Sequence, residues 1–253
     1  MCNVCGCSGE ENLPAEPEEQ HSATFAAHVH EPIMQDHDRH ADRNRQTFSD
    51  SGVLVVNLMS SPGAGKTSLI EATIRELGAR FRIGVIEGDL ETENDAARIR
   101  RLDVQAEQIT TGIACHLDAH MVGHVLPRFD LEALDLLFIE DVGNLICPAC
   151  FDLGQHANVV LLSVPEGIDK PEKYPVMFRA ADLIVLSKID YLPHAPEFTV
   201  AGATASAHRI GVRADTVALS ARSGLGLDNW VAWLEQALTH GLADRRNRMN
   251  LST

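Results

Sequence analysis

The chain has 253 residues, of which 45% are hydrophobic, and its formal net charge is −15. This length suffices for one large domain. The acidic balance and the low number of aromatic residues, with two Trp and two Tyr, argue against a nucleic-acid binder, which normally carries a basic stripe or a stacking surface. No apolar run approaches the ~20 residues of a membrane helix, and the N-terminus lacks the basic and apolar regions of a signal peptide. We therefore expect a cytoplasmic protein with no membrane and no nucleic-acid partner.

The first 47 residues differ in composition from the rest of the chain. They hold nine acidic and three basic residues, three prolines and almost no apolar periodicity. Such a segment buries too little surface to offset the entropy lost on ordering. We predict a flexible tail over residues 1–47 and a folded domain over residues 48–253.

The tail contains side chains that suit metal ions. Cys2, Cys5 and Cys7 place three thiolates within six residues, and this donor set suits Ni²⁺. The alternative is an unstructured tip that oxidises readily. Five histidines between positions 21 and 40 favour either a weak metal store or a solvated polar linker.

Strand-like and helix-like patterns alternate after the tail. The strand-like runs are almost continuously apolar, which is typical of parallel strands buried on both faces. This alternation predicts a doubly wound α/β fold with a mostly parallel sheet and ligands at the carboxyl ends of the strands. The predicted strands cover residues 53–59, 82–87, 104–109, 134–140, 158–164, 182–187 and 216–220. The predicted helices cover residues 67–77, 95–102, 113–126 and 227–238.

A phosphate-binding loop is predicted directly after the first strand. The sequence SSPGAGKT at residues 60–67 matches G-x-x-x-x-G-K-[ST], except that Ser60 replaces the first glycine. Backbone N–H groups and the positive end of the following helix can bind phosphate oxygens there. Lys66 would reach the β- and γ-phosphates, and the Thr67 hydroxyl would bind Mg²⁺. The remaining predicted phosphate-binding residues are Gly63, Ala64, Gly65 and Ser68.

Acidic residues follow two further strands. Glu140 and Gly143 lie in a segment that resembles the D-x-x-G switch element of nucleotide hydrolases, with Glu140 in the Asp position. A carboxylate there can hold Mg²⁺, and the Gly143 N–H can face the γ-phosphate. Asp89, after the second predicted strand, is a candidate for binding Mg²⁺ or orienting water. We predict Thr67, Asp89 and Glu140 as Mg²⁺ ligands, and Lys66, Asp89 and Glu140 as catalytic residues.

The segments that follow two later predicted strands indicate which nucleotide base is bound. Lys188 and Asp190 stand in a segment that resembles N-K-x-D, with Ser187 in the Asn position. Asp190 can accept hydrogen bonds from two guanine nitrogens, whereas adenine would leave its oxygens unpaired. Ser220 and Ala221, after the last strand, resemble the loop that meets the guanine O6 atom. These motifs favour GTP and GDP over ATP.

A second group of cysteines and histidines lies within the predicted domain. His116, His120 and His124 share one face of the predicted helix 113–126, beside Cys115. Cys147 lies within the predicted switch, so the γ-phosphate could control its position. Thiolates and imidazoles suit Ni²⁺ or Zn²⁺, although free thiols packed as small apolar groups are the alternative. His120 and His124 are weaker candidates than the other three, and so is Cys150, which follows in C-x-x-C.

With its cysteine tip, its CHLDA segment (115–119) and its DVGNLICPA segment (141–149), the chain resembles the nickel-incorporation GTPases of hydrogenase maturation. This B-type maturation family belongs to the SIMIBI class of P-loop proteins. The resemblance implies slow GTP hydrolysis and delivery of Ni²⁺ to the large subunit of nickel–iron hydrogenase. It implies a homodimer linked by nucleotide and metal, a small zinc-containing nickel accessory protein and the hydrogenase large-subunit precursor as partners.

The resemblance also implies two metal sites. Cys115, His116 and Cys147 would form a site at the dimer interface, with Zn²⁺ as a competing occupant. The tight nickel site would be formed by Cys2, Cys5 and Cys7.

Two residues depart from the pattern of this family. Asp141 stands where a neutral Asn is usual, and Ser187 replaces the Asn that usually braces the phosphate loop. Two alternative functions remain open at this point. One is a urease-type nickel GTPase, or a GTPase that serves a cobalamin enzyme. The other is a nickel storage protein with a vestigial nucleotide site.

Overall fold

The computed structural model describes the backbone of residues 22–251 and the side chains of residues 36–239. Its centre is a seven-stranded sheet in the order β3-β2-β4-β1-β5-β6-β7, and every neighbouring pair is parallel. The strands are β1 (Leu54–Ser60), β2 (Ile83–Asp89), β3 (Gln105–Thr110), β4 (Leu136–Glu140), β5 (Ala157–Ser163), β6 (Leu183–Ser187) and β7 (Asp215–Ala218). The predicted parallel sheet is therefore confirmed.

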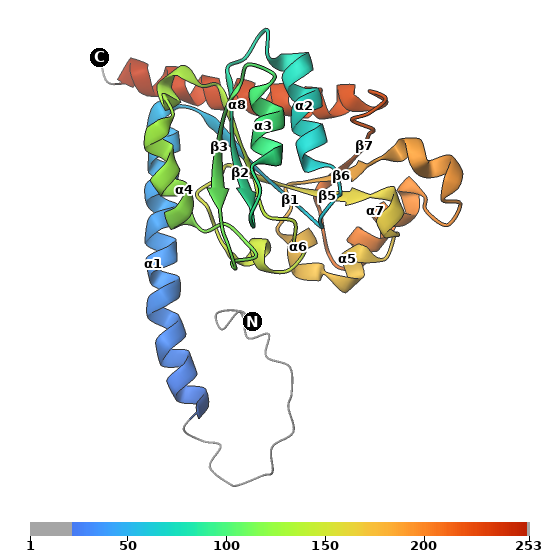
Figure 1. The fold of residues 1–253 in the computed structure, drawn as a ribbon, viewed down its shortest axis with the longest axis horizontal. Helices are drawn as coiled ribbons and strands as arrows, with labels where there is room; N and C mark the ends of the chain where they lie inside the picture. Colours follow the sequence, from blue (N-terminus) through green and yellow to red (C-terminus); the bar gives the residue numbers. More distant parts are fainter. Residues whose placement is uncertain (1–21, 252–253) are drawn as a thin grey trace.

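Helices cover both faces of this sheet (Figure 1). One face packs against α2 (Lys66–Leu77), α3 (Asn94–Arg100) and α8 (Leu227–Leu251). On the other face, the half of the sheet formed by β1 to β4 packs against α1 (Ser22–Ser51) and α4 (Ala119–Val125). The remaining helices are α5 (Lys170–Lys173), α6 (Pro175–Arg179) and α7 (Val200–Arg209). Short 3₁₀ helices are η1 (Leu126–Arg128), η2 (Leu131–Ala133), η3 (Cys147–Cys150), η4 (Val164–Glu166) and η5 (Ile189–His194). No described helix is long and apolar enough to cross a membrane.

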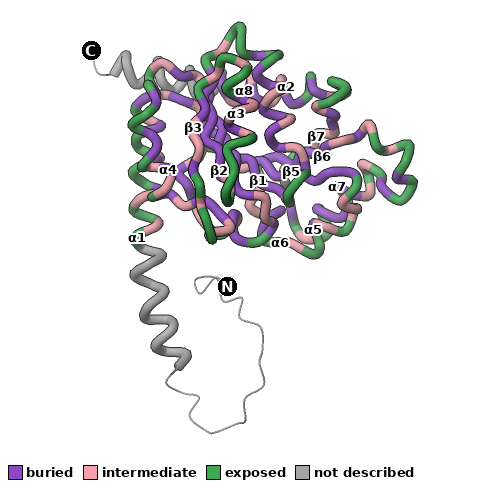
Figure 2. Tube along the Cα trace, in the orientation of Figure 1, coloured by how far each residue is buried: buried purple, intermediate pink, exposed green. Residues whose placement is uncertain are grey.

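The helix α1 crosses the predicted boundary at residue 47. Its last four turns pack on the domain, and Ala41 and Phe48 are almost completely buried (Figure 2). The buried Asn44 side chain donates hydrogen bonds to the carbonyl oxygens of Ala119 (2.8 Å) and Leu153 (3.1 Å). The prediction of a flexible tail is thus wrong for residues 36–47. The buried residues in this part of α1 are Ala41, Asn44, Phe48 and Ser51, spaced i, i+3, i+7 and i+10, and the charged residues between them hide this narrow stripe.

We expect the C-terminal half of α1 to contribute directly to the stability of the domain. Phe48→Ala removes a fully buried ring and should lower the free energy of unfolding by about 3–5 kcal/mol. The matched control is Asp42→Ala, because Asp42 lies on the exposed side of the same helix and should change stability by less than about 0.5 kcal/mol. Urea titration of both variants checks the prediction, and equal stabilities would show that α1 does not belong to the folded domain.

Candidate nucleotide and metal sites

The phosphate-binding loop joins the central strand β1 to α2, as predicted. Gly65 precedes the helix with φ of 103°, a left-handed conformation that side chains disfavour. The switch segment approaches this loop closely, because a Cβ atom added at Gly143 would lie 2.8 Å from the Cα atom of Pro62. Glycine is therefore required at position 143 to let the two segments touch.

Three predicted residues meet beside this loop. The Thr67 hydroxyl donates a hydrogen bond of 3.0 Å to Oε1 of Glu140. Lys66 Nζ lies 3.8 Å from the same oxygen and donates to the Ser60 hydroxyl at 3.3 Å. The ammonium group thus keeps polar partners although Lys66 is only 7% exposed, and Ser60 fits at the first position of the loop.

The sequence reasoning missed Glu87, which lies on β2 directly beside Glu140 on β4. Burial and the neighbouring Glu140 raise the pKa of Glu87 to about 11. Glu87 therefore carries a proton at neutral pH and donates it in a hydrogen bond to Glu140. Burial raises the pKa of Glu140 as well, and the Lys66 charge and the hydrogen bond from Glu87 oppose that rise. The signal was present in the sequence as a glutamate inside an apolar strand.

The predicted nucleotide-binding residues line two neighbouring cavities. The first has a volume of about 420 Å³ and contains the phosphate-loop, Mg²⁺ and switch candidates. The second, of about 210 Å³, contains the base-reading candidates. The first is lined by Gly63, Gly65, Lys66, Thr67, Ser68, Asp89, Glu140, Gly143 and Lys188 among others. The second is lined by Ala64, Lys188, Asp190, Ser220 and Ala221 among others.

Two residues that line these cavities, Ser187 and Lys188, form hydrogen bonds with the backbone of the phosphate loop. The Ser187 hydroxyl donates a hydrogen bond of 2.7 Å to the carbonyl oxygen of Ala64, so the serine braces the loop in place of the usual amide. Lys188, held at φ of 59°, donates from Nζ to the carbonyl oxygen of Gly63 at 2.5 Å. The departure at position 187 therefore leaves the loop supported.

Asp89 lines the first cavity together with Thr67 and Glu140. Its Oδ1 atom accepts hydrogen bonds from the backbone N–H groups of Glu91 and Thr92. Partial burial raises the pKa of Asp89, but the bonds from Thr92 and Glu91 outweigh it and hold the pKa below its ordinary value. Asp89 is thus an ionised carboxylate near the phosphate site.

Asp141 is the other residue that departs from the family pattern, and its carboxyl group is buried. Its Oδ1 atom accepts hydrogen bonds from the backbone N–H groups of Leu117 (2.9 Å) and Val142 (2.8 Å), which an amide oxygen would also accept. The Oδ2 atom is buried without a partner in the described part of the chain. Burial raises the pKa of Asp141 to about 7, so near neutral pH the group is divided between its charged and neutral forms.

A compact group of metal-binding side chains lies beside this switch segment. The donor atoms of Cys115, His116 and Cys147 all lie within 4.8 Å of one another, and the two sulfur atoms are 3.0 Å apart. The His116 ring stacks on Phe151 at 3.8 Å. Burial lowers the pKa of His116 against the opposing charge of Asp118, so the imidazole is neutral and can donate a lone pair. The structure thus brings these three predicted ligands together.

The helix that was predicted from residue 113 begins only at Ala119. Asp118 caps it by accepting a hydrogen bond from the Met121 N–H at 2.7 Å. His116 therefore precedes the helix, and the predicted shared face of three histidines is wrong. The short aspartate side chain bonds to a free helix N–H and so determines where the helix starts.

The other predicted metal ligands are not part of this cluster. His120 and His124 lie on α4, and Cys150 is exposed. Cys2, Cys5 and Cys7 lie outside the described residues.

Two hydrogen bonds join the metal-binding loop to the switch segment. One is the bond from Leu117 N–H to Asp141, and the other runs from the Asn144 side chain to the carbonyl oxygen of Cys115 at 3.2 Å. Cys147 is itself part of this segment. The loop that carries Cys115 and the segment that faces the phosphate cavity are thus mechanically connected.

Comparisons with known proteins agree with this geometry. The profile of the family described as CobW/HypB/UreG, nucleotide-binding domain, matches residues 54–217. The chain is 53% identical over 208 residues to the hydrogenase maturation factor HypB of Azotobacter vinelandii, covering 82% of this chain and 68% of the relative. It is 41% identical over 206 residues to the probable HypB of Methanocaldococcus jannaschii, covering 81% and 93%.

Two solved structures share the fold. HypB of Helicobacter pylori in complex with nickel superimposes with a TM-score of 0.76 and 38% identity, covering 81% of this chain and 96% of that chain. HypB of Archaeoglobus fulgidus superimposes with a TM-score of 0.75 and 43% identity, covering 81% and 99%.

We expect Asp141→Asn to change how stability depends on pH. Because the pKa of Asp141 is raised to about 7 in the folded state, the unfolded chain loses this proton first, and stability falls as the pH rises toward 7. The amide of the variant does not titrate, so the variant does not lose stability in this way. The free energy of unfolding of the variant, compared with that of the wild type, should therefore rise between pH 4 and pH 8 by an amount on the order of a few kcal/mol. Urea titrations across this range measure the change, and a constant difference would contradict it.

Proposed function

Because the chain belongs to the CobW/HypB/UreG family and, within it, to the hydrogenase maturation factors named HypB, we propose that it is a GTP-hydrolysing nickel metallochaperone. It delivers Ni²⁺ to the large subunit of nickel–iron hydrogenase during maturation. The observation that carries this proposal is the continuous segment from Glu140 to Cys147, which lines the phosphate cavity at one end and supplies a metal ligand at the other.

The phosphate cavity suits a nucleotide triphosphate with Mg²⁺. Mg²⁺ prefers oxygen ligands, and Thr67 and Glu140 supply them at the cavity wall. Asp89 adds a second carboxylate at the rim. When bound, the ion neutralises charge that develops on the phosphate oxygens.

Hydrolysis is an in-line attack of water on the γ-phosphoryl group, driven by positioning and charge. Lys66 supplies positive charge to the β- and γ-phosphates, and the Gly143 N–H faces the γ-phosphate. Arg98 also lines the cavity, but its guanidinium group is already bound to Glu71 and Asp95. Intrinsic turnover is therefore slow.

The smaller cavity holds the guanine base. Asp190 accepts from the guanine nitrogens, the Lys188 stem covers the base, and the backbone at Ala221 meets the O6 atom. Leu219 and Ala221 also line this cavity and provide apolar contact.

Asp190→Asn tests the base assignment. The amide replaces one hydrogen-bond acceptor with a donor and leaves a guanine nitrogen unpaired, so the binding free energy of guanine nucleotides should weaken by about 1–3 kcal/mol. Titration with a fluorescent GTP analogue measures this binding free energy. Asp182→Asn is the control, because Asp182 binds the Asn158 backbone away from this cavity. Unchanged GTP affinity in Asp190→Asn would exclude Asp190 from base recognition.

Nucleotide state and metal affinity are linked through the switch segment. When GTP is hydrolysed, the contact between the γ-phosphate and Gly143 is lost. The segment then shifts Cys147 directly, and it shifts Cys115 through the hydrogen bond from Asn144. The Cys115–His116–Cys147 cluster binds Ni²⁺, with Zn²⁺ as a competitor, and it loosens on hydrolysis to release the ion.

The test is the affinity for Ni²⁺ with GDP and with a non-hydrolysable GTP analogue. The full-length chain carries Cys2→Ser, Cys5→Ser and Cys7→Ser, so that α1 stays in place while the tip ligands are removed. The two affinities should differ by about tenfold or more, which corresponds to about 1.4 kcal/mol of coupling. Cys147→Ala should abolish this difference.

Cys150→Ala is the matched control for that experiment, because Cys150 is an exposed thiol of the same 3₁₀ helix. It should leave the difference intact. Equal affinities in both nucleotide states would disprove the gating of the metal site, although GTP hydrolysis itself would still be measurable.

The partners follow from the same proposal. The protein acts in the cytoplasm as a homodimer linked by nucleotide and metal, with the Cys115–His116–Cys147 cluster at the interface. It receives or passes nickel through a small zinc-containing accessory protein and delivers it to the hydrogenase large-subunit precursor. The tight nickel site on this route is the tip formed by Cys2, Cys5 and Cys7.

A further inference from the structure

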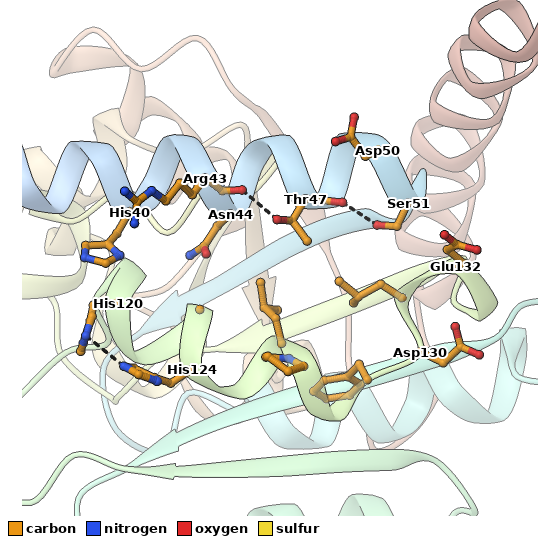
Figure 3. A pocket seen from close by; sticks show the side chains of 15 residues that line it. His40, Arg43, Asn44, Thr47, Asp50, Ser51, His120, His124, Asp130 and Glu132 are labelled. Atoms are coloured by element: carbon orange, nitrogen blue, oxygen red, sulfur yellow. Dashed lines mark hydrogen bonds between the residues drawn. The ribbon is translucent and has the colours of Figure 1, made fainter. Parts of the chain in front are cut away.

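Three histidines from two helices gather beside α4, outside the cysteine cluster. His120 and His124 project from α4, and His40 projects toward them from α1 (Figure 3). The His40 and His120 rings meet edge to face with centroids 4.9 Å apart, and the His120 and His124 centroids are 4.3 Å apart. His40 and His120, which are 80 positions apart in the sequence, thus contact each other through their imidazole rings.

The two histidines of α4 are hydrogen-bonded to each other at a distance that also suits two ligands of one ion. Their Nε2 atoms lie 3.0 Å apart. Two nitrogen ligands bound side by side to one transition-metal ion, each at ~2.0–2.1 Å, are separated by about 2.9–3.4 Å. The spacing i and i+4 on one helix face supports this distance without strain.

This group is separate from the site formed by Cys115, His116 and Cys147. His116 precedes α4 and stacks on Phe151, whereas His120 faces His40. Among the described residues, only the cysteine cluster has three donor atoms within 4.8 Å of one another. The donor atoms of the three histidines do not all lie this close together, so His40 would have to rotate its side chain to join an ion held by His120 and His124, which costs little for a partly exposed residue.

The surroundings of the histidines favour a cation. The Asp36 carboxylate lies 3.9 Å from Nε2 of His40. The histidines border an open cavity of about 880 Å³, in which Arg43 lies beside His40, whereas Asp50, Asp130 and Glu132 lie at the other end (Figure 3). The carboxylate next to the histidines is therefore that of Asp36, which also lies 3.9 Å from Arg39.

We propose that His120 and His124 chelate a divalent transition-metal ion of the nickel and zinc class and that His40 is its third protein ligand. Imidazole nitrogens suit these ions. The ion then ties α1 to α4, because its ligands come from both helices. This site depends on neither nucleotide nor the cysteine cluster, so it goes beyond the proposed function.

The test follows hydrogen–deuterium exchange in residues 36–51 of α1 on addition of Zn²⁺ or Ni²⁺. The full-length chain carries Cys115→Ser and Cys147→Ser, so that metal bound to the cysteine cluster does not contribute. An ion that binds only while α1 is docked slows exchange through α1 opening by 1 + [metal]/Kd, about 11-fold at ten times the Kd. Both His120→Asn and His40→Asn should abolish this slowing.

His208→Asn is the matched control, because His208 is an exposed histidine on α7. It should keep the full effect. If metal does not slow exchange in the parent chain, no ion links α1 to α4, and the proposal is wrong. If His40→Asn retains the slowing while His120→Asn loses it, the ion still requires docked α1 but is not bound by His40, and the assignment of His40 as the third ligand is wrong.

Discussion

The position of Glu140 is the constraint on which the rest of the site depends. The register of the central strands pairs Leu58 of β1 with Glu140 of β4 and Glu87 of β2 with Glu140 on the other side. This register places one carboxylate against both Thr67 and Lys66 of the phosphate loop. A shift of two residues along either strand would bring an apolar side chain to that place and leave the ammonium group buried without a counter-charge.

Much of the fold and of the nucleotide site could be predicted because the signals are local. The strands β1, β4, β5 and β6 are mostly apolar runs. The site motifs follow strand ends, so the carboxyl edge of the sheet brings together motifs as distant in sequence as Lys66 and Asp190. The cysteine cluster could be predicted for a different reason: its residues belong to segments with a recognisable family pattern.

The features that were missed depend on contacts between distant segments. The packing of α1 rests on a narrow stripe of buried residues and on hydrogen bonds from Asn44 to backbone carbonyl groups more than 70 positions away. The start of α4 depends on whether Asp118 caps the helix or faces solvent, and periodicity cannot decide this. Glu87 carries a proton only because Glu140 lies beside it on the neighbouring strand. The contacts of Asn44 and the pairing of Glu87 with Glu140 have no signature within one window of sequence, although a glutamate inside an apolar strand is itself a local signal.

The segment between Glu140 and Cys147 is anchored at both ends, by the strand register at one and by the cysteine cluster at the other. Asp141, Gly143 and Asn144 fix it at three further points through hydrogen bonds or close backbone contact. Surface loops usually tolerate insertions and deletions. This loop can accept a different side chain at an exposed position such as Ile146, but one residue more or less would displace the sulfur from its partners. Its length, rather than its composition, is therefore the property that the two sites together constrain most strictly.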